Sequence, residues 1–432
     1  MLKKKIVILG GGLAGLSAAW HLQNKGRNCL VFEKEPEVGG LCRSKQIKGF
    51  IFDYDGHLLH FRHKYTFEFV RQLLGRNLVK HDRNASVYTY SKYLRFPFQA
   101  NLYGLPTRVV KECLFDFIQA NQNLYHAEKE HLNFSSWIHK TFGRGIARHF
   151  MVPYNRKFWT IEPRHLTCEW LDGFIPLPSL AEVIEGTIEE SKRQFGYNAQ
   201  FWYPKKGGIQ ELAKAFASDL KCIYTFHRVV KIDIESQQVY FSHKLKQKYD
   251  ILIFSLPLPE LLHLAQRLPS SVVEALKRLK CTSIFNLNLG IGRSHLSDKH
   301  WVYFPDERFV FFRVGFPVNF APHAAPKGTS SLYVEVAHSQ KKPINKNTIC
   351  HDIIRDLIRA GILDASDKIL TKDANDIPYG YIIYDQKRSK ALVRIRDFLV
   401  KNNIYGLGRY GTWSYLSMED CLLDGKRVAE YL

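Results

Sequence analysis

Residues 3–44 read KKKIVILGGGLAGLSAAWHLQNKGRNCLVFEKEPEVGGLCRS and contain the pattern that decides the fold. Residues 5–9 (KIVIL) form a short β-branched run, which is typical of a buried parallel strand. A glycine motif with two apolar residues inside it comes next: Gly10, Gly12, Leu13, Ala14 and Gly15. In G-x-G-x-x-G spacing the first glycine allows a tight turn, the second lets a phosphate approach the backbone, and the third lets a helix pack on the strand. The pattern of residues 13–24 predicts that helix.

A second strand and an acidic residue complete this unit. Residues 28–33 (NCLVFE) have strand character, and Glu33 ends the run, with Lys34 after it. A carboxylate at this point of a strand–turn–helix–strand unit meets the hydroxyl groups of a ribose. The order of strand, glycines, helix, strand and acid therefore predicts a Rossmann-like dinucleotide-binding fold. These residues alone leave open whether the dinucleotide is NAD or FAD.

The composition favours an anionic ligand. The chain has 432 residues, which suggests two or three domains, and its formal net charge is +21. Such a charge attracts nucleic acid, acidic membrane surfaces or phosphorylated molecules. The basic residues are spread along the chain without a basic arm or a nucleic-acid-binding signature. We therefore predict no nucleic-acid partner and favour an anionic cofactor or small-molecule substrate, while peripheral contact with a membrane stays open.

Hydropathy and cysteine spacing bear on location and on metal binding. No apolar run approaches the roughly 20 residues of a membrane-spanning helix, and the first residues do not have the form of a secretory signal. We therefore predict a cytoplasmic protein without a transmembrane segment. None of the eight cysteines has another at C-x-x-C spacing, so we expect reduced thiols and no metal site.

The residues after Glu33 distinguish FAD from NAD. They include a second glycine pair and an arginine, in the order Gly39, Gly40, Leu41 and Arg43. This arrangement resembles the extended signature of the superfamily of FAD-dependent amine oxidases, protoporphyrinogen oxidases and UDP-galactopyranose mutases. In such proteins a second glycine turn contacts the phosphate or flavin side of an extended FAD, and an arginine there can meet the pyrophosphate charge. The resemblance implies FAD as the cofactor.

Further stretches resemble the same superfamily over most of the chain. Residues 203–215 (YPKKGGIQELAKA) resemble its entry to a helix, and residues 250–257 (DILIFSLP) resemble a strand of its FAD domain. Val229 matches the residue that flanks adenine. Residues 403–423 (NIYGLGRYGTWSYLSMEDCLL) resemble the closing FAD signature, in which the positive end of a helix lies near the flavin. The cofactor residues implied in this signature are Gly408, Arg409, Ser417 and Met418.

The resemblance implies an α/β fold with a discontinuous architecture. A Rossmann-like FAD-binding domain of the GR2 type is expected from residues 1–90, 203–260 and 396–432, with an inserted mixed α+β substrate domain. Residues 91–202 are expected to form a mostly helical insert on the substrate side. Residues 261–395 are expected to form the substrate-binding sheet region.

Several stretches are similar to the UDP-galactopyranose mutases within that superfamily. They are residues 55–57 (DGH), 94–101 (LRFPFQAN), 153–159 (PYNRKFW), 381–388 (YIIYDQKR) and 409–415 (RYGTWSY). The resemblance implies a nucleotide-sugar isomerase with no net redox change. In this chemistry N5 of the reduced flavin attacks the anomeric carbon, and NAD(P)H is a possible source of the reduced form.

The same resemblance implies the site residues. Gly56 and His57 are expected against the flavin, with His57 tuning its reactivity. The residues expected in catalysis are His57, Arg313, Tyr381 and Tyr415. The residues expected to bind a nucleotide-sugar are Asn155, Trp159, Arg313, Tyr381, Arg388 and Tyr415. Arginines and tyrosines suit this task because they donate hydrogen bonds to a diphosphate.

The chain departs from the mutases at one position that bears on the substrate. Phe174 stands where those enzymes carry an arginine for the diphosphate, and either Arg156 or Arg164 is a candidate to replace it. An alternative function therefore stays open, namely an FAD-dependent oxidoreductase of the amine oxidase, protoporphyrinogen oxidase or desaturase type that takes hydride from an amine or apolar substrate. A non-catalytic flavoprotein is a third reading. Converging arginines and tyrosines over the flavin would favour the isomerase, and an apolar tunnel would favour the oxidoreductase.

Overall fold

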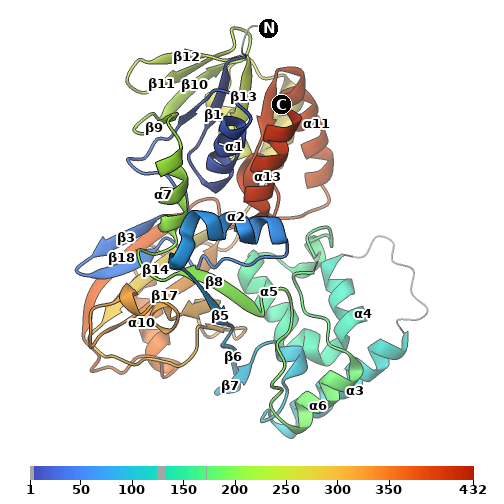
Figure 1. The fold of residues 1–432 in the computed structure, drawn as a ribbon. Coiled ribbons are helices and arrows are strands. Elements are labelled where there is room, and N and C mark those ends of the chain that lie inside the picture. Colours follow the sequence, from blue (N-terminus) through green and yellow to red (C-terminus); the bar gives the residue numbers. More distant parts are fainter. Residues whose placement is uncertain (1–3, 124–132, 172) are drawn as a thin grey trace.

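The computed structural model describes residues 4–123, 133–171 and 173–432 (Figure 1). A parallel sheet of strand order β19-β13-β1-β2-β9 occupies the upper part of Figure 1. Its strands are β1 (Ile6–Leu9), β2 (Cys29–Phe32), β9 (Ile223–Tyr224), β13 (Ile251–Phe254) and β19 (Ile404–Gly406). Every residue of β1 and β13 is buried. Because both faces of this sheet are covered, these strands read as continuous apolar runs rather than as alternating patterns.

Helices from distant parts of the chain cover this sheet. They are α1 (Leu13–Asn24), α2 (Lys64–Leu74), α7 (Gln210–Asp219), α11 (Arg388–Lys401), the short α12 (Gly408–Gly411) and α13 (Met418–Tyr431). Helices α1 and α13 lie side by side (Figure 1). A Cβ on Gly425 would lie 2.6 Å from Cβ of Ser17, and Ser17 Oγ donates to the carbonyl of Leu422 over 2.7 Å. The last helix of the chain therefore packs on the first, which confirms the predicted Rossmann-like α/β fold.

A second, seven-stranded sheet lies below the first in Figure 1 and has the order β18-β14-β17-β16-β15-β6-β7. Its strands are β6 (Ala85–Thr89), β7 (Lys92–Arg95), β14 (Ser283–Ile291), β15 (Trp301–Tyr303), β16 (Arg313–Gly315), β17 (Ser330–His338) and β18 (Ile369–Ile377). Helix α10 (Ile349–Arg359) shares an apolar core with one face of the sheet. The other face packs against aromatic residues of α5 (Val152–Trp159) and of the segment after β18, namely Tyr154, Phe158 and Tyr381.

One strand lies in a different sheet from the one that the predicted domains imply. Strand β6 falls within residues 1–90, which we expected in the FAD-binding domain, but it pairs in parallel with β15 and antiparallel with β7. Its backbone hydrogen bonds therefore belong to the second sheet. The pairing Trp301 with Ala85 joins residues that are far apart in the chain, so no local pattern could have indicated it.

Smaller elements complete the chain. The insert at residues 91–202 contains β7 and the helices α3 (Thr107–Asn123), α4 (Phe134–Ile146), α5 and α6 (Leu180–Ile188), with a π-helical turn at Ala147–Met151. Strands β3 (Ser44–Ile47) and β4 (Phe50–Asp53) form a hairpin, and β5 (Leu78–Asp82) pairs with β8 (Gln200–Pro204). Strands β10 (Val229–Asp233), β11 (Gln238–Phe241) and β12 (Lys246–Lys248) form an antiparallel sheet, and α8 (Leu261–Leu264) and α9 (Ser270–Lys277) follow β13. Among the described residues, no helix combines the length and the apolar character needed to cross a membrane.

Candidate functional site

The first turn of the chain ties the two glycine groups and the acid together. The backbone turns from β1 into α1 at Gly10, whose φ is +101°. The N–H of Gly11 donates to Oε2 of Glu33 over 2.7 Å, and the N–H of Gly39 donates to the carbonyl of Gly11 over 2.8 Å. The acid at the end of β2 and the second glycine pair therefore meet at the turn that precedes α1, as their order in the sequence predicts.

The space at the start of α1 fits the pyrophosphate of a dinucleotide. A Cβ on Gly15 would lie 2.1 Å from the carbonyl oxygen of Gly10, so Gly15 is required for packing. A Cβ on Gly12 would meet nothing within 4 Å, and a Cβ on Gly40 would lie 3.3 Å from Cα of Gly12. The first N–H groups of α1 have no partner inside the helix and point to this open space. A helix N-terminus of this kind binds anionic groups.

We expect Gly12→Ala to weaken FAD binding by about 5- to 100-fold, because the new methyl group would occupy part of the phosphate space at a cost of about 1–3 kcal/mol. The protein itself should fold normally, since φ of Gly12 is −73° and its Cβ position is unobstructed. Flavin absorbance after gel filtration and the thermal midpoint of the apoprotein provide the two measurements. In contrast, Gly15→Ala should impair folding. Unchanged flavin retention in Gly12→Ala would contradict this placement of the phosphates.

Other predicted cofactor residues lie around the same turn. Arg43 donates from Nε to the carbonyl of Gly40 over 3.0 Å and pairs with Glu35 at 3.2 Å, so its charge is already balanced. Leu13 and Ala14 are buried inside α1, whereas Lys34 is half-exposed and pairs with Glu35. Val229 begins β10, and the nearby N–H of His227 donates to the carbonyl of Glu33 over 2.7 Å. The segment before β10 therefore runs beside the acid at the end of β2.

The C-terminal signature approaches the turn from the other side. Gly408 has φ of +69°, its N–H donates to Asp424 over 2.7 Å, and a Cβ on it would lie 2.6 Å from Cβ of Ala14. Ser417 caps α13 through a reciprocal pair of hydrogen bonds with Asp420, and Met418 is the first residue of that helix. Leu41 packs against an apolar cluster of the second sheet, which consists of Ile284, Phe312, Ala337 and Ile377. The two ends of the chain therefore meet at the predicted FAD site.

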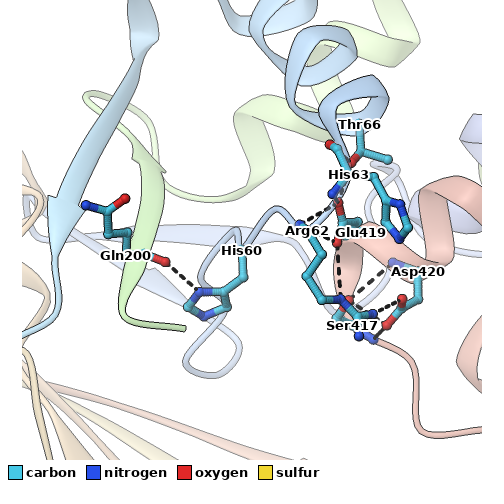
Figure 2. Close-up of polar contacts among 8 residues, drawn as sticks. All are labelled: His60, Arg62, His63, Thr66, Gln200, Ser417, Glu419 and Asp420. Carbon is cyan, nitrogen blue, oxygen red and sulfur yellow. Dashed lines mark hydrogen bonds and ion pairs between the residues drawn. The ribbon is translucent and has the colours of Figure 1, made fainter. Parts of the chain in front are cut away.

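A buried carboxylate that the sequence did not indicate fixes α13 against α2. Glu419 accepts hydrogen bonds from the backbone N–H groups of Arg62 and His63 at 2.9–3.0 Å and from the hydroxyl of Thr66 (Figure 2). It therefore satisfies N–H groups at the start of α2, which has no side-chain cap of its own. Arg62 also pairs with Asp420 (Figure 2). Its guanidinium lies 5.8 Å from the ring centre of Phe174.

His60 lies deeper than the sequence suggested. Because neither His60 nor His63 has an acidic partner at ligand spacing, the sequence predicts both at the surface, and His63 is exposed. His60 is only partly exposed, and its Nδ1 lies 3.1 Å from the carbonyl of Gln200 on β8 (Figure 2). Burial lowers the pKa of His60 to about 4, and burial together with the neighbouring His81 lowers the pKa of His300 to about 4. Nδ1 of His300 accepts a hydrogen bond from the N–H of Asn84 over 3.1 Å, which requires the neutral ring.

These two histidines predict a loss of stability in acid. The unfolded chain binds protons at both rings below pH about 6.5, whereas the folded protein does not until pH about 4. Stability is therefore complete above pH 6.5 and decreases as the pH falls to about 4, by at most about 3 kcal/mol per ring. Urea midpoints between pH 7 and 4 measure the decrease. The variant His300→Gln should show a shallower dependence, and an equal slope in both proteins would contradict the assignment.

The turn that carries His57 lies against the second sheet. A Cβ on Gly56 would lie 2.5 Å from the hydroxyl oxygen of Tyr333 on β17, so only glycine allows this approach. The N–H of His57 donates to the carbonyl of Asp55 over 2.9 Å. Burial lowers the pKa of His57, and the positive charges of Arg409 and Arg313 lower it further against the opposing effect of Asp55. His57 is therefore a neutral ring that two arginines face.

Arg313 is paired inside the protein. Strands β16 and β17 place it directly opposite Glu335, and its guanidinium contacts both carboxylate oxygens, with Nη2 at 2.6 Å from Oε1. Glu335 has no exposed surface. Burial raises the pKa of Glu335 although Arg313 opposes the shift. The predicted diphosphate ligand therefore already has a counter-charge, and the sequence could not show this cross-strand register.

Tyrosines and a second arginine surround the same space. The rings of Tyr381 and Tyr415 are 5.8 Å apart, and the guanidinium of Arg409 lies 5.8 Å and 5.3 Å from their centres. Arg409 donates from Nε to the carbonyl of Leu416 over 2.8 Å and forms no ion pair with any described residue. Within the described chain, the hydroxyl groups of Tyr154, Tyr333, Tyr381 and Tyr415 make no hydrogen bond. Burial raises the pKa of each, so these hydroxyls are neutral donors.

We call this set the polar centre. It consists of Asp55, His57, Tyr154, Arg313, Tyr333, Glu335, Tyr381, Arg409 and Tyr415. Its members come from the turn after β4, from β16 and β17 of the second sheet, from the segment after β18, from α12 and the residues after it, and from α5 of the helical insert. Tyr154, Tyr381 and Tyr415 are partly exposed, so their hydroxyl groups are not all enclosed by the protein. Such an arrangement can hold an anion through one unneutralised guanidinium and several phenolic hydroxyl groups.

Three predicted substrate residues make their contacts within the protein. Asn155 donates to the carbonyl of Met151 in its own helix over 2.8 Å. Trp159 has no exposed surface, and its ring centre lies 6.0 Å from that of Tyr415. Arg388 donates to the carbonyl of Trp413 and stacks at 3.8 Å on Tyr384. These side chains support the polar centre from behind rather than lining it.

The structure also shows which arginine lies near Phe174. The ring of Phe174 meets Tyr415 edge-on at 5.0 Å, at the border of the polar centre. Arg156 pairs with Glu162 at 2.7 Å and with Glu307 at 2.9 Å, and Arg164 is exposed. The arginine beside Phe174 is instead Arg62, which is remote in the sequence and carried no recognisable signal.

Comparisons with known proteins bear on the family and the fold of the chain. A sequence model of the family described as "Flavin containing amine oxidoreductase" matches residues 13–432. The crystal structure of a reduced UDP-galactopyranose mutase is similar to this protein, with a TM-score of 0.93 and 27% sequence identity. The similarity covers 100% of this chain and 94% of the mutase chain.

Among curated proteins, a probable flavin-containing monoamine oxidase A of Dictyostelium discoideum is 25% identical over 183 residues, which are 39% of this chain and 40% of that protein. Coproporphyrinogen III oxidase of Bacillus subtilis (strain 168) is 20% identical over 98% of this chain and 97% of its own. The chain spans only about half of the length of three such curated relatives: 40% of the monoamine oxidase, 53% of an uncharacterized protein of Methanothermococcus thermolithotrophicus and 51% of a 4,4'-diaponeurosporene oxygenase of Staphylococcus haemolyticus (strain JCSC1435). With a family match from the first helix to the last residue, the chain belongs to the flavin-containing amine oxidoreductases and is an FAD-dependent flavoenzyme of that family.

Proposed function

We propose that the protein is a nucleotide-sugar isomerase of the UDP-galactopyranose mutase type. The polar centre is the observation that carries the proposal. Its hydroxyl groups and its unneutralised Arg409 converge beside His57, where a tetrapyrrole or polyene substrate would require apolar walls. The similarity to a reduced UDP-galactopyranose mutase at 27% identity supports the same assignment.

The chain's own residues divide into two groups in this proposal. The first would hold FAD through the glycine turns, Glu33, Arg43, Val229, Gly408 and the start of α13. When bound and reduced, with NAD(P)H as a possible source of electrons, FAD supplies the nucleophile for sugar isomerisation. The second group, Arg409, Tyr381 and Tyr415, would bind and orient the diphosphate of the substrate, with Arg62 near the position of the missing arginine. The neutral ring of His57 would accept or donate one hydrogen bond at the reacting face.

Ligand binding tests this function. The FAD-loaded protein is reduced with dithionite and titrated with UDP and with UDP-galactose, while the flavin spectrum and the thermal midpoint are recorded. Binding to the folded state should stabilise it by about 2.7 kcal/mol at a ligand concentration of 100 times Kd, and the thermal midpoint should rise accordingly. A spectrum and a midpoint that neither ligand changes would contradict the proposal.

One observation favours an oxidoreductase as the second candidate. Phe174, at the border of the polar centre, stands where the mutases carry an arginine. The ring centres of Phe158 and Tyr381 are 4.1 Å apart, so one side of the polar centre is aromatic. The full-length similarity to a coproporphyrinogen III oxidase is consistent with this candidate. Anaerobic mixing of the oxidised protein with amines, porphyrinogens and carotenoid precursors would test it. Bleaching of the flavin by one of them would favour the oxidoreductase, and no bleaching by any would count against it.

A further inference from the structure

A large cavity lies at the C-terminal end of α5. It has a volume of about 2070 Å³ and is bounded by the last turns of α5, residues 161–169, the end of α9, residues 339–342 and residues 383–387. Among the described residues that line it, none belongs to the polar centre. Its volume exceeds the roughly 300–1,000 Å³ of an ordinary small-molecule site. The cavity is therefore large enough for a ligand and separate from the site described above.

The charges around this cavity leave a positive excess. Its acidic residues are already paired: Glu162 and Glu307 with Arg156, Asp385 with Lys280, and Glu169 with Arg388. The cavity is also lined by basic residues that form no ion pair with any residue in the described ranges, namely Lys157, Arg164, Lys341, Lys342 and Lys387. A concave surface with this balance concentrates anions.

Lys157 is the residue that most needs a counter-charge. Its side chain is 3% exposed, and Nζ donates to the carbonyls of Phe304 and Asp306, both at 2.8 Å. An ammonium has three donors, so one N–H is left over, and no carboxylate of the described chain lies within ion-pair distance. Burial lowers the pKa of Lys157 well below its ordinary value. A buried charge without an opposite charge is costly, and an anion in the cavity would relieve that cost.

Two threonines that line the same cavity also have hydroxyl groups without a partner among the described residues. Thr160 is 6% exposed and lines the cavity, and its buried Oγ1 has no hydrogen-bond partner among the described residues. Thr160 follows directly on α5, three residues after Lys157, and both residues line the cavity. Thr160 has φ of +56°, which is unusual for a β-branched residue. The buried Oγ1 of Thr167, which also lines the cavity, is likewise without a partner in the described part.

We propose that this cavity is a second binding site, for a phosphate-bearing small molecule whose phosphate is held by Lys157, Thr160 and Arg164. A phosphate group has several acceptor oxygens and a double negative charge, which matches one ammonium, one guanidinium and a hydroxyl group. Lys341 and Lys342 would add long-range attraction at the rim. The site is independent of the proposed isomerase function, because it shares no lining residue with the polar centre.

The test uses inorganic phosphate as the probe and the FAD-loaded protein. Thermal midpoints are measured in potassium phosphate and in potassium chloride of equal ionic strength, so that charge screening is the same. Near 100 times Kd, phosphate should raise the midpoint of the native protein by about 3 °C or more. Lys157→Met and Arg164→Gln should each remove at least half of this shift. Arg164 is exposed, so its variant should fold even if the other does not.

Two further variants separate this cavity from other anion sites. Arg409→Met removes the free cation of the polar centre, which can itself hold phosphate, so this variant should lower the shift only by the share of the polar centre and should keep the share that Lys157→Met removes. Arg267→Gln changes an exposed arginine elsewhere, with 77% of its side chain exposed, and should leave the shift unchanged. The proposal is overturned if phosphate gives no shift, if Lys157→Met and Arg164→Gln both keep the full shift, or if Arg409→Met removes it.

Discussion

Arg409→Met is expected to lower kcat/KM for interconversion of UDP-galactopyranose and UDP-galactofuranose by about 30- to 1,000-fold. Arg409 is the guanidinium of the polar centre that no described carboxylate neutralises, and the rings of Tyr381 and Tyr415 lie within 6 Å of it. Loss of a buried charge contact to a diphosphate costs about 2–4 kcal/mol, and each 1.4 kcal/mol changes the rate constant about tenfold. Steady-state kinetics of the reduced enzyme provide the measurement.

Three controls identify the cause of this loss. Arg409→Lys keeps the charge and should recover part of the activity, although less than all of it because lysine cannot bind two oxygens in the same plane. Arg267→Met, at an exposed position, should keep full activity. Flavin content per chain must be measured in each variant, because Arg409 also belongs to the C-terminal FAD signature. Normal kcat/KM in a flavin-loaded Arg409→Met enzyme would show that the substrate is held elsewhere.

Glu335→Leu is expected to lower the free energy of unfolding by about 3–5 kcal/mol, because it would leave Arg313 buried and unpaired. Arg313 and Glu335 lie opposite each other on β16 and β17, and Glu335 has no exposed surface. The double variant Arg313→Met/Glu335→Leu should recover most of the loss, since two apolar residues leave no buried charge. Urea unfolding of the four proteins gives the coupling energy directly.

An exposed ion pair serves as the matched control for this cycle. Arg267 and Glu235 form a contact of 2.6 Å, but their side chains are 77% and 68% exposed. The same replacements there should change the free energy of unfolding by less than about 1 kcal/mol. If the two pairs gave equal coupling energies, the Arg313–Glu335 pair would not be a buried interaction.

Local motifs predicted most of the FAD-binding fold. The sequence placed a helix at residues 13–24, and α1 has those bounds. Gly15 had to be glycine because its Cβ would collide with the carbonyl of Gly10, so the constraint lies within a few residues and is readable. Gly39 and Glu33 contact the same turn from more than 20 residues later in the chain, and the order of the motif rather than local sterics made them readable. Local rules therefore predicted the dinucleotide-binding fold, and the resemblance of the second glycine pair and Arg43 to a known signature supplied FAD as the cofactor.

Long-range pairings were not predictable in the same way. Strand β6 joins the second sheet by pairing with β15, which lies more than 200 residues later in the chain. A local sequence pattern cannot indicate such a pairing. From the sequence we predicted Arg313 as a diphosphate ligand. Its partner Glu335 could not be predicted, because the register of β16 against β17 that places the two residues opposite each other depends on the tertiary fold. Glu419 and Arg62 appeared as ordinary helix-end and turn residues, although folding brings them together at the start of α2 (Figure 2). Substrate-site residues are therefore less certain from sequence than cofactor residues, since each depends on such contacts.

The decisive measurement is turnover of a nucleotide-sugar by the reduced and the oxidised protein. The FAD-loaded enzyme is incubated anaerobically with UDP-galactopyranose, with and without dithionite, and the sugar is analysed by chromatography. We predict that UDP-galactofuranose forms only with reduced flavin, approaches a fixed ratio from either direction, and leaves the flavin reduced. If the reduced enzyme forms no furanose while a porphyrinogen, amine or polyene bleaches the oxidised flavin, the protein is an oxidoreductase and the isomerase assignment is wrong.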